Sequence, residues 1–114
     1  MQQRVALVRT VLFNPSFLLL DEPFGSLDAL TRHEIQLWLM NVHQTFHSNI
    51  FLITHDIQEA ILLSDRIYVM SSRPGEIKEE VIVDIPRPRT LIDLTSPHAV
   101  ALEKKLLSLL MKTL

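Results

Sequence analysis

Two adjacent carboxylates, Asp21 and Glu22, directly follow the apolar run at 17–20. Because Pro15 and Pro23 leave no room for a helix, this run predicts a strand buried on both faces of a parallel sheet. Ligands of open parallel sheets bind at the carboxyl ends of the strands. Neighbouring strand residues point in opposite directions, so one carboxylate can bind Mg²⁺ while the other activates water. By itself, the pattern is equally compatible with an acidic pair that opens a solvated loop.

A second apolar run at 50–53 ends in Thr54, His55 and Asp56. Two parallel strands joined by one helix would place Glu22 and His55 at the same edge of the sheet. An imidazole can donate a hydrogen bond to a phosphate oxygen near neutral pH. A lone histidine after a strand is more often structural, but the acidic pair at the neighbouring strand end favours a functional site.

The order of strands and helices predicts an α/β protein with a mostly parallel sheet flanked by helices and a C-terminal hairpin and helix. Helices are expected over 2–13, 29–47, 57–64 and 97–114, and strands over 17–20, 50–53, 66–70 and 76–83. Helical periodicity predicts one apolar face on the second helix, made of Leu30, Leu37, Trp38, Val42 and Phe46. Gly25 is the expected flexible point of the loop at 23–28.

The composition excludes several classes of protein. The chain has 114 residues, 47% of them hydrophobic and 21% charged, which is typical of one globular domain. The absence of cysteine excludes disulfides and thiolate metal sites. The formal net charge of -2, with no basic block, gives no indication of nucleic-acid binding. No apolar run approaches the roughly 18 residues that span a bilayer, so membrane association is expected only through a partner.

Three ordered segments resemble motifs of ABC transporter ATPases. Residues 18–32 (LLLDEPFGSLDALTR) are similar to the Walker B motif and D-loop, and residues 53–60 (ITHDIQEA) to the switch-histidine loop. Residues 2–7 (QQRVAL) resemble the helix that follows the signature loop. The resemblance covers essentially the whole chain. It implies that residues 1–114 are the C-terminal portion of an ABC-type nucleotide-binding domain, with a partial P-loop NTPase fold.

The resemblance also implies a role for each site residue. Asp21 would bind Mg²⁺ through water, and Glu22 would be the general base or polarise the water. His55 would contact the γ-phosphate of ATP. Asp28 would lie at the seam of an ATPase homodimer, near the nucleotide of the partner subunit. Gln3 would lie beside the signature loop.

The segments 70–75 and 83–89 are similar to ATPases of nitrate, sulfonate, taurine and related importers. This implies an ATP-hydrolysing importer subunit that lies peripherally on the cytoplasmic face of the cell membrane. Its partners would be a second ATPase subunit, a transmembrane permease and, indirectly, a solute-binding protein, with no nucleic acid. In physical terms, the Pro-Arg-Pro-Arg segment at 86–89 is expected to be a stiff surface connector.

The sequence also departs from the family. It contains no G-x-x-x-x-G-K-[ST] motif, which is the Walker A loop that cradles phosphates, and no Leu-Ser-Gly-Gly. The isolated chain is therefore expected to be inactive. A non-catalytic truncated remnant that binds no nucleotide alone is an alternative. An ABC ATPase of the DNA-repair type is another, although residues 27–32 and the segment 70–89 argue against it.

Two further features have alternative readings. His43 and His47 are spaced four apart and could together bind a metal, but solvated histidines on a helix face are favoured because no third ligand is found. The last helix carries the leucines Leu102, Leu106, Leu109 and Leu110. It could bind a partner, but core packing against the sheet is favoured.

Overall fold

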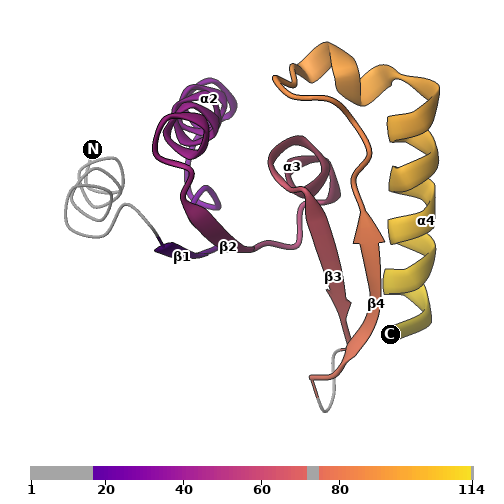
Figure 1. The fold of residues 1–114 in the computed structure, drawn as a ribbon. Coiled ribbons are helices and arrows are strands. Elements are labelled where there is room, and N and C mark those ends of the chain that lie inside the picture. The colour runs from indigo at the N-terminus through magenta and orange to yellow at the C-terminus, as the bar shows by residue number, and fades with distance from the viewer. Residues whose placement is uncertain (1–16, 72–74, 114) are drawn as a thin grey trace. The chain divides into compact units, whose positions relative to one another are not determined.

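A computed structural model describes residues 17–71 and 75–113 of the chain. The chain divides into two compact units, Met1–His55 and Asp56–Leu114 (Figure 1). The helix expected over 2–13 lies outside the described residues. Among the residues that are described, no helix combines the length and apolar character needed to cross a membrane.

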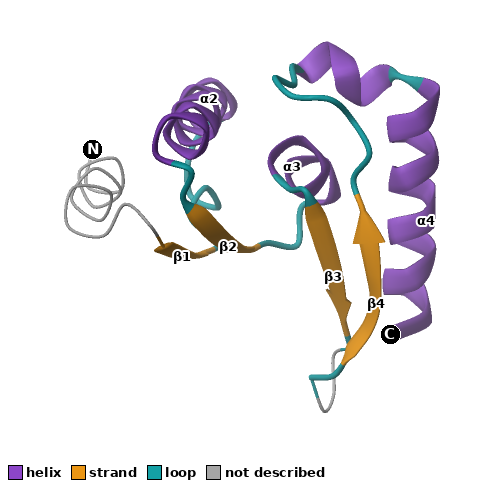
Figure 2. Cartoon of the chain, in the orientation of Figure 1, coloured by secondary structure: helices purple, strands orange, loops and turns teal. Residues whose placement is uncertain are grey.

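The first unit contains two parallel strands and the helix that connects them. Strand β1 (Phe17–Asp21) pairs with β2 (Asn49–Ile53), with Leu18 opposite Ile50. Helix α2 (Ala29–Phe46) forms the crossover between the two strands (Figure 2). The predicted pair of parallel strands and its helical connection are confirmed.

Only one face of this small sheet is buried among the described residues. Leu18 and Leu20 of β1 are buried. The opposite face exposes a row of large apolar side chains from both strands: Phe17, Leu19, Phe51 and Ile53. Two of them, Phe17 and Phe51, lie with their ring centroids 5.6 Å apart. The prediction that the first strand is buried on both faces is therefore wrong for the described part of the chain.

Helix α2 buries a face that overlaps only in part with the predicted one. Its buried residues are Ile35, Gln36, Leu39 and Val42. Of the predicted face, Val42 is buried and Trp38 is half-buried, whereas Leu30, Leu37 and Phe46 are exposed. The spacing of Ile35, Leu39 and Val42 is that of one helical stripe. Because apolar residues surround the helix, periodicity alone selects no single face, and the contacts in the fold decide which stripe is buried.

The second unit is built around an antiparallel hairpin. Its elements, in chain order, are α3 (Ile57–Leu63), β3 (Arg66–Met70), β4 (Ile77–Ile82), the short 3-10 helix η1 (Leu91–Thr95) and α4 (Pro97–Thr113). The predicted hairpin is confirmed, since β3 pairs antiparallel with β4. The described strands thus form two two-stranded sheets, one parallel and one antiparallel. The expected parallel sheet is present as its two strands β1 and β2.

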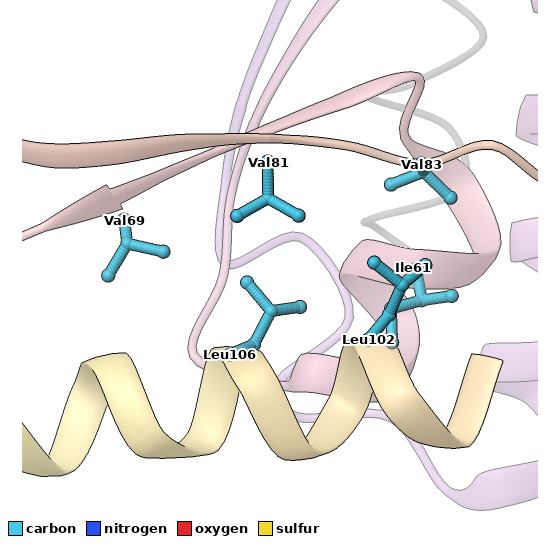
Figure 3. Close-up of a cluster of buried hydrophobic side chains, with 6 residues drawn as sticks. All are labelled: Ile61, Val69, Val81, Val83, Leu102 and Leu106. Carbon is cyan, nitrogen blue, oxygen red and sulfur yellow. The ribbon is translucent and has the colours of Figure 1, made fainter. Parts of the chain in front are cut away.

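A cluster of six buried apolar side chains holds this second unit together. They are Ile61, Val69, Val81, Val83, Leu102 and Leu106 (Figure 3). Leu109 and Leu110 pack against the cluster and are partly buried. The predicted core packing of the last helix is thus confirmed. Ser96 caps the N-terminus of this helix as expected, because its Oγ accepts a hydrogen bond from the Ala99 amide at 3.2 Å.

The Pro-Arg-Pro-Arg segment is a surface connector only in part. Pro86 and Pro88 are exposed as expected, but the prediction is wrong for Arg89. Arg89 is only 4% exposed, and its guanidinium donates to backbone carbonyls that include those of Ile61 and Ser64. Arg87 donates through Nε to the Asp65 carboxylate at 2.9 Å. The arginines therefore tie residues 86–89 to the end of α3.

Helix α4 offers a matched test of this packing. Leu106 is 2% exposed and belongs to the cluster, whereas its neighbour Leu107 is 49% exposed. Leu106→Ala should lower the free energy of unfolding by about 2–5 kcal/mol, because it leaves a cavity in the cluster. Leu107→Ala should change it by only about 0.5 kcal/mol. Urea unfolding followed by circular dichroism measures both, and equal losses would contradict the described packing.

Candidate functional site

The two carboxylates lie at the carboxyl edge of the parallel strands. Asp21 is the last residue of β1 and is paired with Ile53 of β2. The Glu22 amide then donates to the Ile53 carbonyl at 2.8 Å, which extends the hydrogen-bonded ladder by one residue. The backbone of both acidic residues is therefore held by the neighbouring strand.

Glu22 adopts a left-handed backbone conformation, with φ of 49°. This conformation is uncommon for a residue with a side chain and costs roughly 1–2 kcal/mol. The turn that follows supports it, because the Gly25 amide donates to the Glu22 carbonyl at 3.4 Å and Phe24 is almost fully buried. Glu22 is thus the residue of this loop that has a left-handed backbone. Gly25, the expected flexible point, does not have a positive φ.

Glu22 and His55 are in contact. The Nδ1 atom of His55 lies 2.7 Å from Oε1 of Glu22, a short hydrogen bond across the ends of the two strands. An ionised carboxylate can only accept, so Nδ1–H is the donor. The sequence prediction that these two residues share one sheet edge is confirmed.

The pair lies at the surface, with the His55 side chain 87% exposed and that of Glu22 39% exposed. Exposed ion pairs stabilise a fold by only about 0–1 kcal/mol, because water screens the charges. The pair therefore adds little to the stability of the fold. The contact fixes the direction of a carboxylate that is open to solvent.

Asp21 is the residue that could hold a metal ion. It is exposed, and its carboxylate is the kind of oxygen ligand that Mg²⁺ prefers. Within the described residues, no group of three or more potential ligands could hold a metal. Mg²⁺ often binds to one or two carboxylates, waters and substrate phosphates, so Asp21 fits an ion that arrives with a nucleotide.

Asp28 caps helix α2. Its Oδ1 accepts from the Thr31 amide at 2.9 Å, and its Oδ2 accepts from the Thr31 hydroxyl at 3.2 Å. The hydrogen bond from the Thr31 backbone, followed by that from the Thr31 side chain, holds the pKa of Asp28 below its usual range. The carboxylate is therefore charged at neutral pH and fixed at the start of the helix. Its place at a dimer seam stays a prediction, and Gln3 lies outside the described residues.

The two histidines of α2 do not form a helix-face pair. His43 donates from Nδ1 to the Ser48 carbonyl at 2.8 Å and is part-buried. His47 lies beyond the last turn, as the left-handed C-cap of α2 with φ of 53°. The prediction of two solvated histidines on one helix face is therefore wrong in its geometry.

Comparison with known proteins identifies the family. No protein-family model matches the chain. The chain is 46% identical over 110 residues to an uncharacterized ABC transporter ATP-binding protein of Methanocaldococcus jannaschii, an alignment that covers 96% of this chain and 40% of the relative. It is 45% identical over 107 residues to an aliphatic sulfonates import ATP-binding protein of Bacillus cereus, covering 94% of this chain and 41% of the relative.

A nitrate transport protein of Klebsiella oxytoca is 46% identical over 95 residues, covering 82% of this chain and 36% of the relative. The chain thus spans about two fifths of the length of these curated relatives. The alignments cover most of this chain, between 82% and 96% of it. This chain belongs to the family of ABC transporter ATP-binding proteins.

Proposed function

We propose that this chain is the C-terminal portion of a nucleotide-binding domain with a P-loop NTPase fold, and that it supplies part of the ATP-hydrolysing site of an ABC importer. The observation that carries the proposal is the 2.7 Å contact between Glu22 and His55 at the carboxyl edge of two parallel strands. Membership of the ABC ATP-binding family supports ATP as the nucleotide.

Glu22 acts on the attacking water. Its carboxylate accepts a hydrogen bond from the water, orients it and takes its proton as the water oxygen attacks the γ-phosphorus. The bond from that phosphorus to the β–γ bridging oxygen breaks, and ADP leaves. The left-handed backbone and the bond to Ile53 hold the carboxylate at the strand end. Little reorganisation is then needed when the water binds.

His55 has two tasks in this arrangement. Its Nδ1–H orients the Glu22 carboxylate, as the contact between them indicates. When the ring is protonated, Nε2–H can donate to an oxygen of the γ-phosphate. The His55 side chain can thereby contact both the general base and the γ-phosphate.

Asp21 would hold Mg²⁺ through water, and the bound ion would neutralise charge on the β- and γ-phosphate oxygens. Asp28, fixed and charged at the start of α2, would face the nucleotide site of a second ATPase subunit. Gln3 would lie beside the signature loop. These assignments make the site a shared one, completed by a second copy.

The importer setting adds further partners. A transmembrane permease would carry the solute, a solute-binding protein would deliver it, and the ATPase pair would lie on the cytoplasmic face of the membrane. Relatives named for sulfonate import and nitrate transport support this subgroup over an ABC ATPase of the DNA-repair type. The choice of solute would belong to the permease and the binding protein.

A second candidate function is a non-catalytic remnant that binds no nucleotide alone. It is favoured by the sequence, which contains no G-x-x-x-x-G-K-[ST] motif to cradle the phosphates. Asp21, Glu22 and His55 would then act only together with an intact subunit.

The DNA directly upstream of the codon for Met1 separates the two candidates. The catalytic proposal predicts an open frame that encodes Leu-Ser-Gly-Gly next to Met1 and a G-x-x-x-x-G-K-[ST] motif further back. A stop codon close upstream, with neither motif, would favour the remnant. Under both candidates, the purified 114-residue chain should show negligible ATP turnover, and ordinary enzyme rates from it would contradict this expectation.

In the longer product, Glu22→Gln should lower ATP turnover by about 10²–10⁴-fold, because the general base is lost. ATP binding should persist, since the substitution removes no phosphate contact. Turnover measured by phosphate release, and binding measured with a fluorescent ATP analogue, check both statements. Glu34→Gln, an exposed carboxylate on α2, is the matched control. Unchanged turnover in the Glu22 variant would remove this residue from the mechanism.

The contact between the two side chains predicts non-additive effects. Residues that act as one unit lose most of their joint contribution when either is removed. The double variant Glu22→Gln, His55→Ala should therefore be about as slow as the slower single variant. The test compares the turnover numbers of the unsubstituted protein, the two single variants and the double variant. If the two single losses multiplied in the double variant, the side chains would act independently.

A further inference from the structure

Arg32 reaches back from helix α2 to the loop that follows Glu22. Its Nη2 donates to the Leu27 carbonyl at 3.2 Å, in a part-buried contact. Leu27 precedes the N-cap residue Asp28, whose carbonyl accepts the first bond of the helix, from the Arg32 amide at 2.9 Å. The Arg32 side chain therefore joins α2 to the loop one residue before the hydrogen bonds of the helical backbone begin.

The stability of α2 does not by itself explain an arginine at this position. Arg32 is the fourth residue of the helix, and the N-terminus of a helix carries a partial positive charge that disfavours a cation. Asp28 already caps this end, because its carboxylate accepts from the Thr31 amide at 2.9 Å. The bond to the Leu27 carbonyl therefore points to a role for the guanidinium in the loop.

The loop between Glu22 and Leu27 is a pair of hydrogen-bonded turns. The Gly25 amide donates to the Glu22 carbonyl at 3.4 Å, and the Leu27 amide donates to the Phe24 carbonyl at 3.2 Å. Phe24 is almost fully buried and anchors the first half of the loop. The second half ends at the carbonyl that Arg32 holds, so the contact with Arg32 closes the loop against α2.

Glu22 needs this loop because its backbone is left-handed, with φ of 49°. A residue with a side chain keeps such a conformation only where the surrounding structure imposes it. On the strand side, the Glu22 amide is held by the Ile53 carbonyl. On the other side, its carbonyl is held by the Gly25 amide, and hence by the order of the loop.

We propose that Arg32 is a positioning residue for Glu22, acting through the loop at 23–28. The guanidinium holds the Leu27 carbonyl, the closed loop sustains the left-handed backbone of Glu22, and the carboxylate is thereby directed toward His55. This rests on the proposed function for the task of Glu22, but the restraint itself requires no nucleotide.

The chemistry of the contact favours arginine over lysine. A guanidinium presents five N–H donors in a rigid planar fork, so less rotational freedom is lost for each hydrogen bond that it forms. A lysine ammonium is a compact charge on a flexible stem, and it can donate to the Leu27 carbonyl with less preorganisation. Arg32→Lys should therefore retain part of the effect, and Arg32→Met none of it.

The test uses nuclear magnetic resonance of the full 114-residue chain. Amide hydrogen exchange at Leu27 reports on the loop, and exchange at Thr31, whose amide donates to Asp28, reports on the start of α2. Nitrogen chemical shifts of the His55 ring report on its contact with Glu22. The variant Glu22→Ala supplies the shifts of a ring that lacks this contact.

Arg32→Met should speed exchange of the Leu27 amide roughly tenfold, as expected for loss of one charge-assisted hydrogen bond, and leave the Thr31 amide unchanged. It should also move the His55 ring shifts toward those of Glu22→Ala, and Arg32→Lys should restore both signals in part. The matched control, Arg66→Met, removes an exposed arginine of the second unit that pairs with Glu80 at 3.7 Å. This control should change none of these signals.

Four results would overturn the proposal. Unchanged exchange at Leu27 in Arg32→Met would show that the guanidinium does not hold the loop. Equal acceleration at Leu27 and Thr31 would show that it stabilises the start of α2 instead. Faster exchange at Leu27 with unchanged His55 shifts would show that the loop does not direct Glu22. Complete unfolding of both Arg32 variants would make Arg32 a residue of general stability.

This readout is independent of the proposed ATPase activity. Altered His55 shifts in Arg32→Met would support the positioning role even if the longer product hydrolysed no ATP. Conversely, a loss of turnover in Glu22→Gln would leave the catalytic proposal intact if Arg32 proved to have no influence on the contact between Glu22 and His55.

Discussion

The parallel pairing of β1 with β2 is the constraint on which the candidate site depends. Residues 21 and 53 are opposite one another, and the ladder continues to the Glu22 amide. Because parallel strands end at the same edge, this register brings Glu22 and His55 together from distant parts of the chain. A shift of one residue would send each side chain to the other face of the sheet and separate the pair.

The second unit solves a different physical problem, which is how to keep a seven-residue helix and a hairpin ordered with a small core. Six buried apolar side chains supply the packing, and the α4 leucines cover the hairpin (Figure 3). The buried Arg89 guanidinium donates hydrogen bonds to carbonyls at the end of α3 and in its own segment, so these buried polar groups have partners. Apolar burial and a fully partnered charge act together here, because neither would order these short elements alone.

The proposed function needs more than the groups that the described residues bring together. Glu22 and His55 are in contact at the ends of two strands, and the sequence contains no G-x-x-x-x-G-K-[ST] motif to bind phosphates. The chain spans about two fifths of its relatives' length, so the proposed activity depends on groups beyond these 114 residues. The exposed apolar row of Phe17, Leu19, Phe51 and Ile53 is consistent with this, because a two-stranded sheet is marginally stable unless more structure covers it.

The sequence by itself determined the order of elements, the family and the meeting of Glu22 with His55, because these follow from local patterns and from the rule that parallel strands share an edge. Ser96 as a helix cap and the leucines of α4 as core residues were likewise predictable from spacing. Only the tertiary structure decided the left-handed conformation of Glu22, the buried stripe of α2 and the burial of Arg89. These depend on contacts between residues far apart in the chain, and Arg89 shows the reason most clearly. Its local sequence is that of an exposed connector, and the carbonyls at the end of α3, together with those of its own segment, stabilise its charge in the interior.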